Sequence, residues 1–195
     1  DTLRVGDRDP QMTAFIAPEP IRGGGRGGGS SFWVQENSLT TIPVHEYIHT
    51  RQAWLDGDLP ADEDSTIEWL TEASADYYQG YLAWEVLGIF DAQEFYTYAS
   101  TSQYENAVLQ DSDSDAGESK NYEKGRRVLT ALDIRIRQHT NGGQNLTTIF
   151  ERLNGNDGTF SYSDFRSEAV ALTNQSTASW LDTYVTTSAA PTIPQ

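Results

Sequence analysis

The chain has 195 residues, with 29 Asp and Glu against 13 Lys and Arg, so its formal net charge is −16. A charge this negative argues against nucleic acid as a partner, because nucleic-acid binding depends on neutralising phosphates with Lys and Arg. The chain has no Cys, which excludes disulfides and thiolate zinc sites, and no apolar run long enough to span a membrane. Aromatic residues make up 11%, so we expect a single globular domain over residues 1–195 rather than a disordered acidic tail.

Arg greatly outnumbers Lys among the basic residues, since only Lys120 and Lys124 are lysines. Strong acidity with little Lys is typical of proteins that work in molar salt, where the Debye length falls to about 3 Å and self-repulsion is screened. An ordinary acidic secreted protein is the alternative. The chain begins at Asp1 rather than Met, so we expect a processed product or a part of a longer chain. We favour a secreted or cell-surface location over a cytoplasmic one.

Residues 1–40 are expected to form a small β and glycine-rich edge segment, with strands over Met12–Ala17 and Ser31–Gln35 that Gly23–Gly29 separates. Helical patterns follow. The first covers Ile42–Trp54, and a long one starts from an N-cap at Ser65 and runs towards Leu87.

The remainder, residues 91–190, is expected to be a helical subdomain. A helix is predicted over Asp91–Tyr104, an acidic loop over Asp111–Ser119, and a helix that Asn121 caps and that ends at Asn141-Gly142-Gly143. Three shorter helices are expected over Leu146–Leu153, Ser163–Leu172 and Thr177–Val185. The predicted fold is therefore α+β, mainly α, with a small N-terminal β edge and a helical body.

The segment His45-Glu46-Tyr47-Ile48-His49 is an H-E-x-x-H motif. Positions i and i+4 share a helix face, so His45 and His49 can present two imidazoles to one metal ion. Glu46 lies one step round the helix, where its carboxylate can reach a metal-bound water and take its proton. The motif predicts one zinc ion per chain and hydrolysis of a carbonyl compound, with a peptide or protein as substrate.

A catalytic zinc site needs a third protein ligand. No third His follows the motif closely, which leaves a carboxylate from a second helix within residues 41–90. Glu72 is the preferred ligand and Glu68, one turn earlier on the same face, is the alternative. Asp76, one turn after Glu72, is predicted to fix a ligand His through its other ring nitrogen. The only remaining His, His139, is expected at a helix C-terminus on the surface.

This combination resembles the gluzincin zinc metallopeptidases, whose H-E-x-x-H motif is followed about two dozen residues later by W-x-x-E. The stretch that starts at Trp69, WLTEASADYY, is similar to a segment of the glycyl aminopeptidase-like enzymes and the aminopeptidase N family. Tyr122-Glu123-Lys124-Gly125 matches the Y-E-K-G signature of aminopeptidase N relatives. The resemblance covers most of the chain and implies a thermolysin-like catalytic domain. It implies that His45, His49 and Glu72 bind zinc, that Glu46 is the general base, and that Tyr122 stabilises the oxyanion.

The chain departs from the family where aminopeptidase N relatives carry a G-x-M-E-N-like segment whose Glu holds the substrate amine. The matching place contains Gly28, Gly29, Ser30 and Ser31 and no acid. A strand there could still pair with a substrate backbone, and a flexible glycine linker is the alternative. Two other functions stay open. One is a catalytically weak or inactive gluzincin-fold module that binds peptides or serves in assembly, and the other is hydrolysis of an ester or epoxide.

Overall fold

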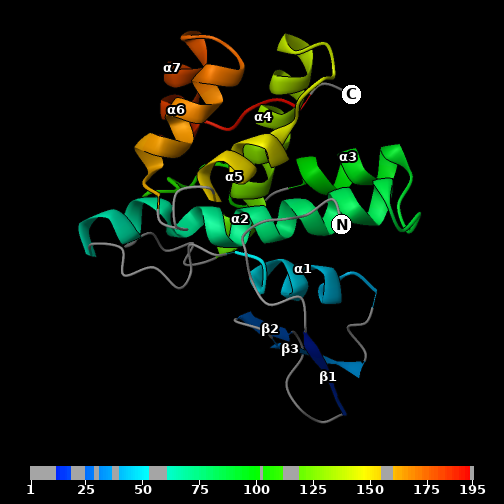
Figure 1. Ribbon diagram of the computed structural model, residues 1–195. Coiled ribbons are helices and arrows are strands. Elements are labelled where there is room, and N and C mark those ends of the chain that lie inside the picture. Colours follow the sequence, from blue (N-terminus) through cyan, green and yellow to red (C-terminus); the bar gives the residue numbers. More distant parts are fainter. Residues whose placement is uncertain are drawn as a thin grey trace.

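The computed structural model describes residues 12–18, 25–28, 31–36, 40–52, 61–101, 103–111, 119–154 and 160–193. The predicted mainly helical fold with a small sheet at the N-terminal end is confirmed. The long helix α2 (Ala61–Glu85) crosses the molecule, with α1 (Ile42–His49) and the sheet on one side and the other helices on the opposite side (Figure 1).

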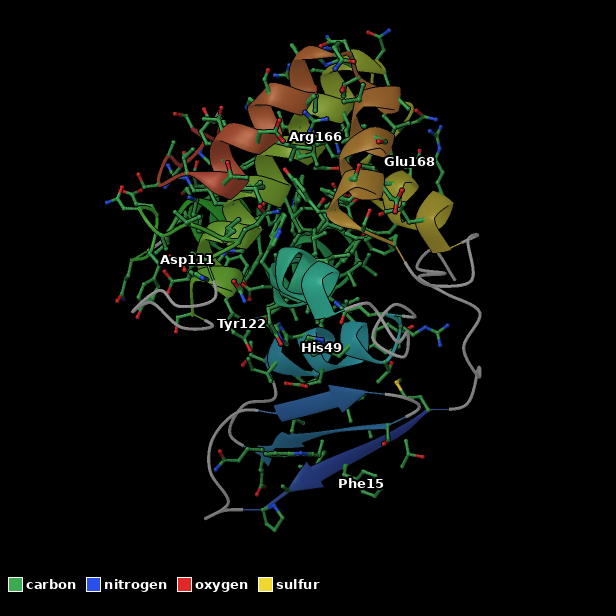
Figure 2. The ribbon with its side chains drawn as sticks, turned by 90° about the vertical axis from the view of Figure 1, so that its left-hand side faces the viewer. Phe15, His49, Asp111, Tyr122, Arg166 and Glu168 are labelled. Atoms are coloured by element: carbon green, nitrogen blue, oxygen red, sulfur yellow. The ribbon has the colours of Figure 1, made fainter. Side chains whose placement is uncertain are left out.

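The sheet has three strands, β1 (Thr13–Ala17), β2 (Gly25–Gly28) and β3 (Ser31–Gln35), in the order β1-β3-β2. β3 is parallel to β1 and antiparallel to β2. The sequence analysis predicted β1 and β3 but not β2, because glycine disfavours strands and its segment was interpreted as a separator. Pairing with β3 overrides that preference. The sheet lies against α1, with β1 and its exposed Phe15 on the far side (Figure 2).

Helix α1 is shorter than predicted, because it ends at His49 rather than continuing to Trp54. The Thr50 hydroxyl donates to the carbonyl of Tyr47 at 2.7 Å, and the amide of Thr50 is bonded to the last turn. Such local side-chain bonds to the backbone compete with helix continuation. The α-helix therefore ends at His49, and residues 50 and 51 form a turn.

Helix α2 begins at Ala61, four residues before the predicted N-cap Ser65. From Trp69 to Gly80 every residue except Thr71 and Glu72 is buried. A helix buried on most of its circumference lies between layers, and the two less buried residues mark where α2 borders the candidate site.

The helical body follows the predicted order closely, and its elements are α3 (Ala92–Ser100), the π-helical turn η3 (Asn121–Gly125), α4 (Arg126–His139), α5 (Leu146–Asn154), α6 (Tyr162–Leu172) and α7 (Ser176–Thr186). The predicted apolar face of α4 is confirmed, since Val128, Leu129, Leu132 and Ile136 are fully buried. The predicted stop after α4 is also confirmed, because Asn141 and Gly142 have positive φ and the Gly142 amide donates to the Arg137 carbonyl at 2.8 Å.

The predicted N-cap at Asn121 is wrong, because Asn121 lies inside η3 and residues 119 and 120 are already helical. π-turns place one extra residue in a helix and are frequent at functional sites. In the described part of the chain, no helix combines the length and the apolar character needed to cross a membrane. Gly29, Ser30, the Glu68 side chain and residues 112–118 lie outside the described structure.

Candidate metal centre

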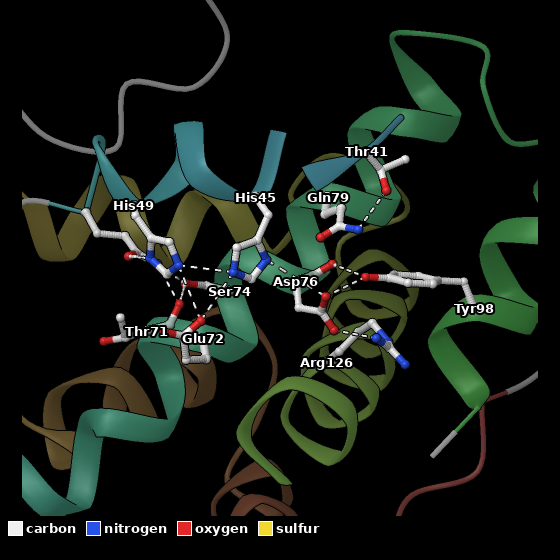
Figure 3. A network of polar contacts seen from close by, with 11 residues as sticks. Thr41, His45, His49, Thr71, Glu72, Ser74, Asp76, Gln79, Tyr98 and Arg126 are labelled. Atoms are coloured by element: carbon white, nitrogen blue, oxygen red, sulfur yellow. Dashed lines mark hydrogen bonds and ion pairs between the residues drawn. The ribbon is translucent and has the colours of Figure 1, made fainter. Parts of the chain in front are cut away.

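Three side chains from α1 and α2 converge on one point. The Nε2 atoms of His45 and His49 are 3.1 Å apart, and Glu72 Oε2 lies 3.2 Å from the first and 3.3 Å from the second. His45 and His49 come from successive turns of α1, and Glu72 faces them from α2 (Figure 3). Among the described residues, they form a group that could hold a metal ion.

The spacing of these three atoms fits zinc. Ligand atoms about 2.0–2.2 Å from a tetrahedral zinc ion lie about 3.3–3.6 Å from one another, close to the three separations found here. Two imidazole nitrogens and one carboxylate oxygen are also donor types that zinc binds, and a set of three leaves a fourth position for water or substrate. The donor set and its spacing therefore both suit a catalytic zinc site.

The electrostatics of the cluster indicate a site built for positive charge. Burial opposes ionisation of Glu72, but hydrogen bonds and charge attraction from His45 and His49 lower its pKa below the ordinary value. Burial likewise disfavours the His49 imidazolium, yet interactions with Glu72, Gln52 and Glu46 raise the pKa of His49. The raised pKa of His49 indicates that the nearby carboxylates favour a cation at this point, which a proton or a metal ion can provide.

Glu46 and Tyr122 lie around this cluster. Glu46 is 6% exposed and lies on α1 next to His45 in the sequence. The Tyr122 ring stacks on the His45 imidazole, with 5.6 Å between ring centroids and 19° between ring planes. Tyr122 comes from η3, a segment 76 residues further along the chain than Glu46. The fold thus brings the predicted base and the predicted hydroxyl donor to the same place.

Asp76 lies beside the cluster, but its carboxylate is occupied by other partners. Its Oδ1 is 3.9 Å from Nδ1 of His45 and accepts a hydrogen bond from the Tyr98 hydroxyl at 2.5 Å. Its Oδ2 pairs with the guanidinium of the buried Arg126. Asp76 therefore lies on the predicted side of the His45 ring, at an ion-pair separation of 3.9 Å from Nδ1 that is longer than a hydrogen bond.

Gln52 is a residue that the sequence analysis assigned no role. Its side-chain oxygen lies 2.7 Å from Nδ1 of His49, on the side of the ring away from the cluster. The sequence feature that could have indicated this contact is a long amide side chain three residues after the second His of the motif. It was missed because the helix was predicted to continue over this position.

His139 is placed as predicted, exposed at the C-terminal end of α4 in the helical body. Its Nδ1 donates to the Arg135 carbonyl at 2.9 Å, and its Nε2 accepts from the Asn174 amide at 2.7 Å. Both ring nitrogens are therefore bound within the helical body.

The sequence matches no protein-family profile and no curated protein sequence. Its fold is similar to solved structures. A two-domain M1 zinc metallopeptidase bound to L-tryptophan matches with a TM-score of 0.68 at 16% identity, and an M1 zinc metallopeptidase from Deinococcus radiodurans with 0.67 at 20%. Each match covers 92% of this chain and 40% of the other. An aminopeptidase N family protein from Idiomarina loihiensis matches with 0.59 at 17%, over 89% of this chain and 36% of the other. The chain thus has the fold of a part of these proteins and spans about 40% of their length.

Proposed function

We propose that this chain is the catalytic part of a zinc metallopeptidase of the gluzincin type. The observation that carries the proposal is the convergence of His45, His49 and Glu72, with three donor atoms 3.1–3.3 Å apart. These residues would hold the metal. When bound, zinc would supply Lewis acidity, which lowers the pKa of water and polarises a substrate carbonyl.

Glu46 is the proposed general base. Its carboxylate is buried beside the ligands and close enough to His49 to contribute to the raised pKa of that residue. It would accept the proton of the attacking water and deliver it to the nitrogen of the leaving amine. General acid–base catalysis of this kind typically contributes about 10²–10⁴-fold in rate.

Tyr122 is the proposed donor to the developing oxyanion. Its ring is held against His45, and a phenol hydroxyl can donate a hydrogen bond. A donor positioned before the reaction stabilises negative charge on the carbonyl oxygen without reorganisation of the site. Tyr122 belongs to the π-turn η3, which packs against α2.

We further propose that β2 receives the substrate. β2 is an edge strand of the described sheet and packs against α1, the helix that carries both His ligands. An extended peptide could pair with main-chain groups along the edge of β2 that faces away from β3, as far as Gly28. Ser31 of β3 is already paired with Thr13 of β1 and Gly28 of β2. Neither β2 nor β3 carries an acidic residue. We therefore expect recognition through main-chain pairing, without a strict need for a free substrate amine.

A second candidate function is a peptide-binding or assembly module that keeps the site but does not turn over. The absence of an acidic residue from β2 and β3 favours it, because these strands offer no carboxylate to hold a substrate amine. The two candidates differ in one observable. Both predict bound zinc and peptide binding, but only the first predicts cleavage.

The test is a cleavage assay on matched peptides with free and acetylated N-termini, in dilute and in molar salt, together with the zinc content of the chain. We expect one zinc per chain, cleavage of both peptide types, and greater activity in molar salt. Glu46→Gln should keep the zinc and lose about 10²–10⁴-fold in rate. Full activity of Glu46→Gln would refute the mechanism, and zinc binding without cleavage would support the binding module.

A further inference from the structure

We propose that Gln52 is a positioning residue of the metal centre, which fixes the tautomer of His49 and the separation of α1 and α2 beside Glu72. The inference deepens the proposed function and rests on it for the identity of the metal. It does not depend on turnover. Gln52 is fully buried and makes three polar contacts that bridge the two helices.

The contacts fix which end of the Gln52 amide faces His49. Its nitrogen donates to the carbonyl of Thr71 at 2.7 Å and to the hydroxyl oxygen of Ser74 at 2.9 Å. The Thr71 carbonyl can only accept, so the amide nitrogen must point towards α2. The Ser74 hydroxyl in turn donates to the same Thr71 carbonyl at 3.3 Å and can accept from Gln52. The amide oxygen is left to face His49.

This orientation determines the tautomer of His49. An amide oxygen has no proton to donate, so the 2.7 Å contact requires a proton on Nδ1 of His49. In the neutral ring, Nε2 then carries the lone pair. That atom points at the cluster, 3.1 Å from His45 Nε2 and 3.3 Å from Glu72 Oε2. Gln52 thus leaves the imidazole in the form that can bind a metal.

The same side chain holds α2 in register with α1. Thr71 directly precedes Glu72 in the chain, so Gln52 ties His49 to the backbone next to the third ligand. Partners outside the ligand set that orient a ligand His typically change metal affinity about 10–100-fold when they are removed. One buried amide therefore supports two of the three ligands.

Gln79 offers a matched control. It is also a buried glutamine between these helices, 7% exposed, and its amide nitrogen donates to the Thr41 hydroxyl at 2.8 Å. It lies at the other end of α1, where its partner Thr41 precedes the helix and belongs to none of the three ligands (Figure 3). Replacing either glutamine by Met keeps the side-chain length and removes one buried amide.

The experiment measures the zinc dissociation constant of the full chain by competition with a chromophoric chelator. We expect Gln52→Met to weaken zinc binding about 10–100-fold and Gln79→Met to change it less than about twofold. Urea denaturation of the metal-free variants should show a loss of stability for both and a larger one for Gln52→Met, which removes more hydrogen bonds. Equal zinc affinities in the two variants would overturn the proposal.

A second measurement needs no variant. The ¹⁵N chemical shifts of the metal-free wild-type chain at alkaline pH should show His49 protonated on Nδ1. Protonation on Nε2 would overturn the proposal even if the chain proved to be an active peptidase. A chain with His49 protonated on Nδ1 but with no cleavage activity would instead refute the proposed function and leave the role of Gln52 intact.

Discussion

Glu72 and Asp76 lie one turn apart on α2, and their carboxylates have partners of opposite kinds. Glu72 faces the Nε2 atoms of His45 and His49, so three atoms that can act as metal ligands meet at one point. Asp76 faces the guanidinium of Arg126 and the hydroxyl of Tyr98, which are hydrogen-bond donors. The first cluster therefore gathers possible metal ligands, and the second pairs a carboxylate with two donors.

The second cluster is complete within the protein. Arg126 also donates to the carbonyl of Thr101 at 2.8 Å, and its guanidinium carbon lies 4.0 Å from the centroid of the Tyr98 ring. Its positive charge therefore balances Asp76 with no ligand added. The Glu72 cluster gains most from an added cation. The degree of charge compensation thus distinguishes the Glu72 cluster, a candidate ligand site, from the structural ion pair of Asp76 and Arg126 beside it.

The largest effect is expected for Glu72→Ala. It removes the only carboxylate among the three ligand atoms, so zinc affinity should fall by more than the roughly 100-fold loss typical of partners outside the ligand set. Zinc content after dialysis and chelator competition measure this. The metal-free variant should lose only about 1 kcal/mol of unfolding free energy, because Glu72 is partly exposed and gives up ordinary hydrogen bonds. Stoichiometric zinc in this variant would contradict its assignment as a ligand.

The reverse pattern is expected for Asp76→Ala. Removal of one partner of a buried ion pair typically costs about 3–5 kcal/mol, because the other charge stays buried without compensation. Urea denaturation of the metal-free chain should show this loss, with a smaller effect on zinc affinity than Glu72→Ala. As a control, replacing Asp76 and Arg126 together by apolar residues should recover part of the stability. A variant that loses zinc but keeps full stability would show that Asp76 serves the metal instead.

Tyr122→Phe tests the hydroxyl in isolation. The ring that stacks on His45 is retained, so zinc affinity and stability should stay near the wild-type values. Loss of one donor to an oxyanion typically lowers kcat by about 10²–10³-fold. Tyr47→Phe is the control, because Tyr47 is also a half-buried tyrosine and occupies a variable position within the motif on α1. Equal rates for the two variants would remove Tyr122 from the mechanism.

The sequence predicted the residues of the cluster because their chemistry depends on local spacing. His45 and His49 share a face of any helix, and Glu72 follows on a second helix that the sequence also predicts. The order and most bounds of the body helices could be predicted for the same reason. The α4 stop, for example, needs only Asn141 and Gly142 with positive φ.

The features that could not be predicted depend on tertiary contacts. β2 consists of residues with low strand propensity and forms because β3 pairs with it. The partner of Asp76 is Arg126, which is fifty residues further along the chain. Gln52 reaches His49 because α1 ends early, and no local pattern predicts that its amide then contacts α2.

Lys124 is a further buried charged residue, and its hydrogen-bond partners carry no opposite charge. Its side chain is fully buried in η3, and its Nζ donates to the carbonyls of Ala107 at 2.5 Å and Thr187 at 2.7 Å. Carbonyl dipoles compensate an ammonium less completely than the carboxylate of Asp76 compensates Arg126. Burial accordingly lowers the pKa of Lys124 to about 8. We therefore expect this charge to make stability depend on pH.

The sign of that dependence follows from proton counts. Between pH 8 and pH 10.5, the unfolded chain keeps a proton on Lys124 that the folded chain has largely released. The free energy of unfolding therefore rises with pH across this window. The contribution of Lys124 to this rise should reach about 1–3 kcal/mol. The measurement is the difference in unfolding free energy between the wild type and Lys124→Met, which cancels the other titrating groups. If this difference in unfolding free energy stayed constant from pH 7 to pH 10.5, the two carbonyls would stabilise the Lys124 ammonium as well as a carboxylate does, and the expectation would be wrong.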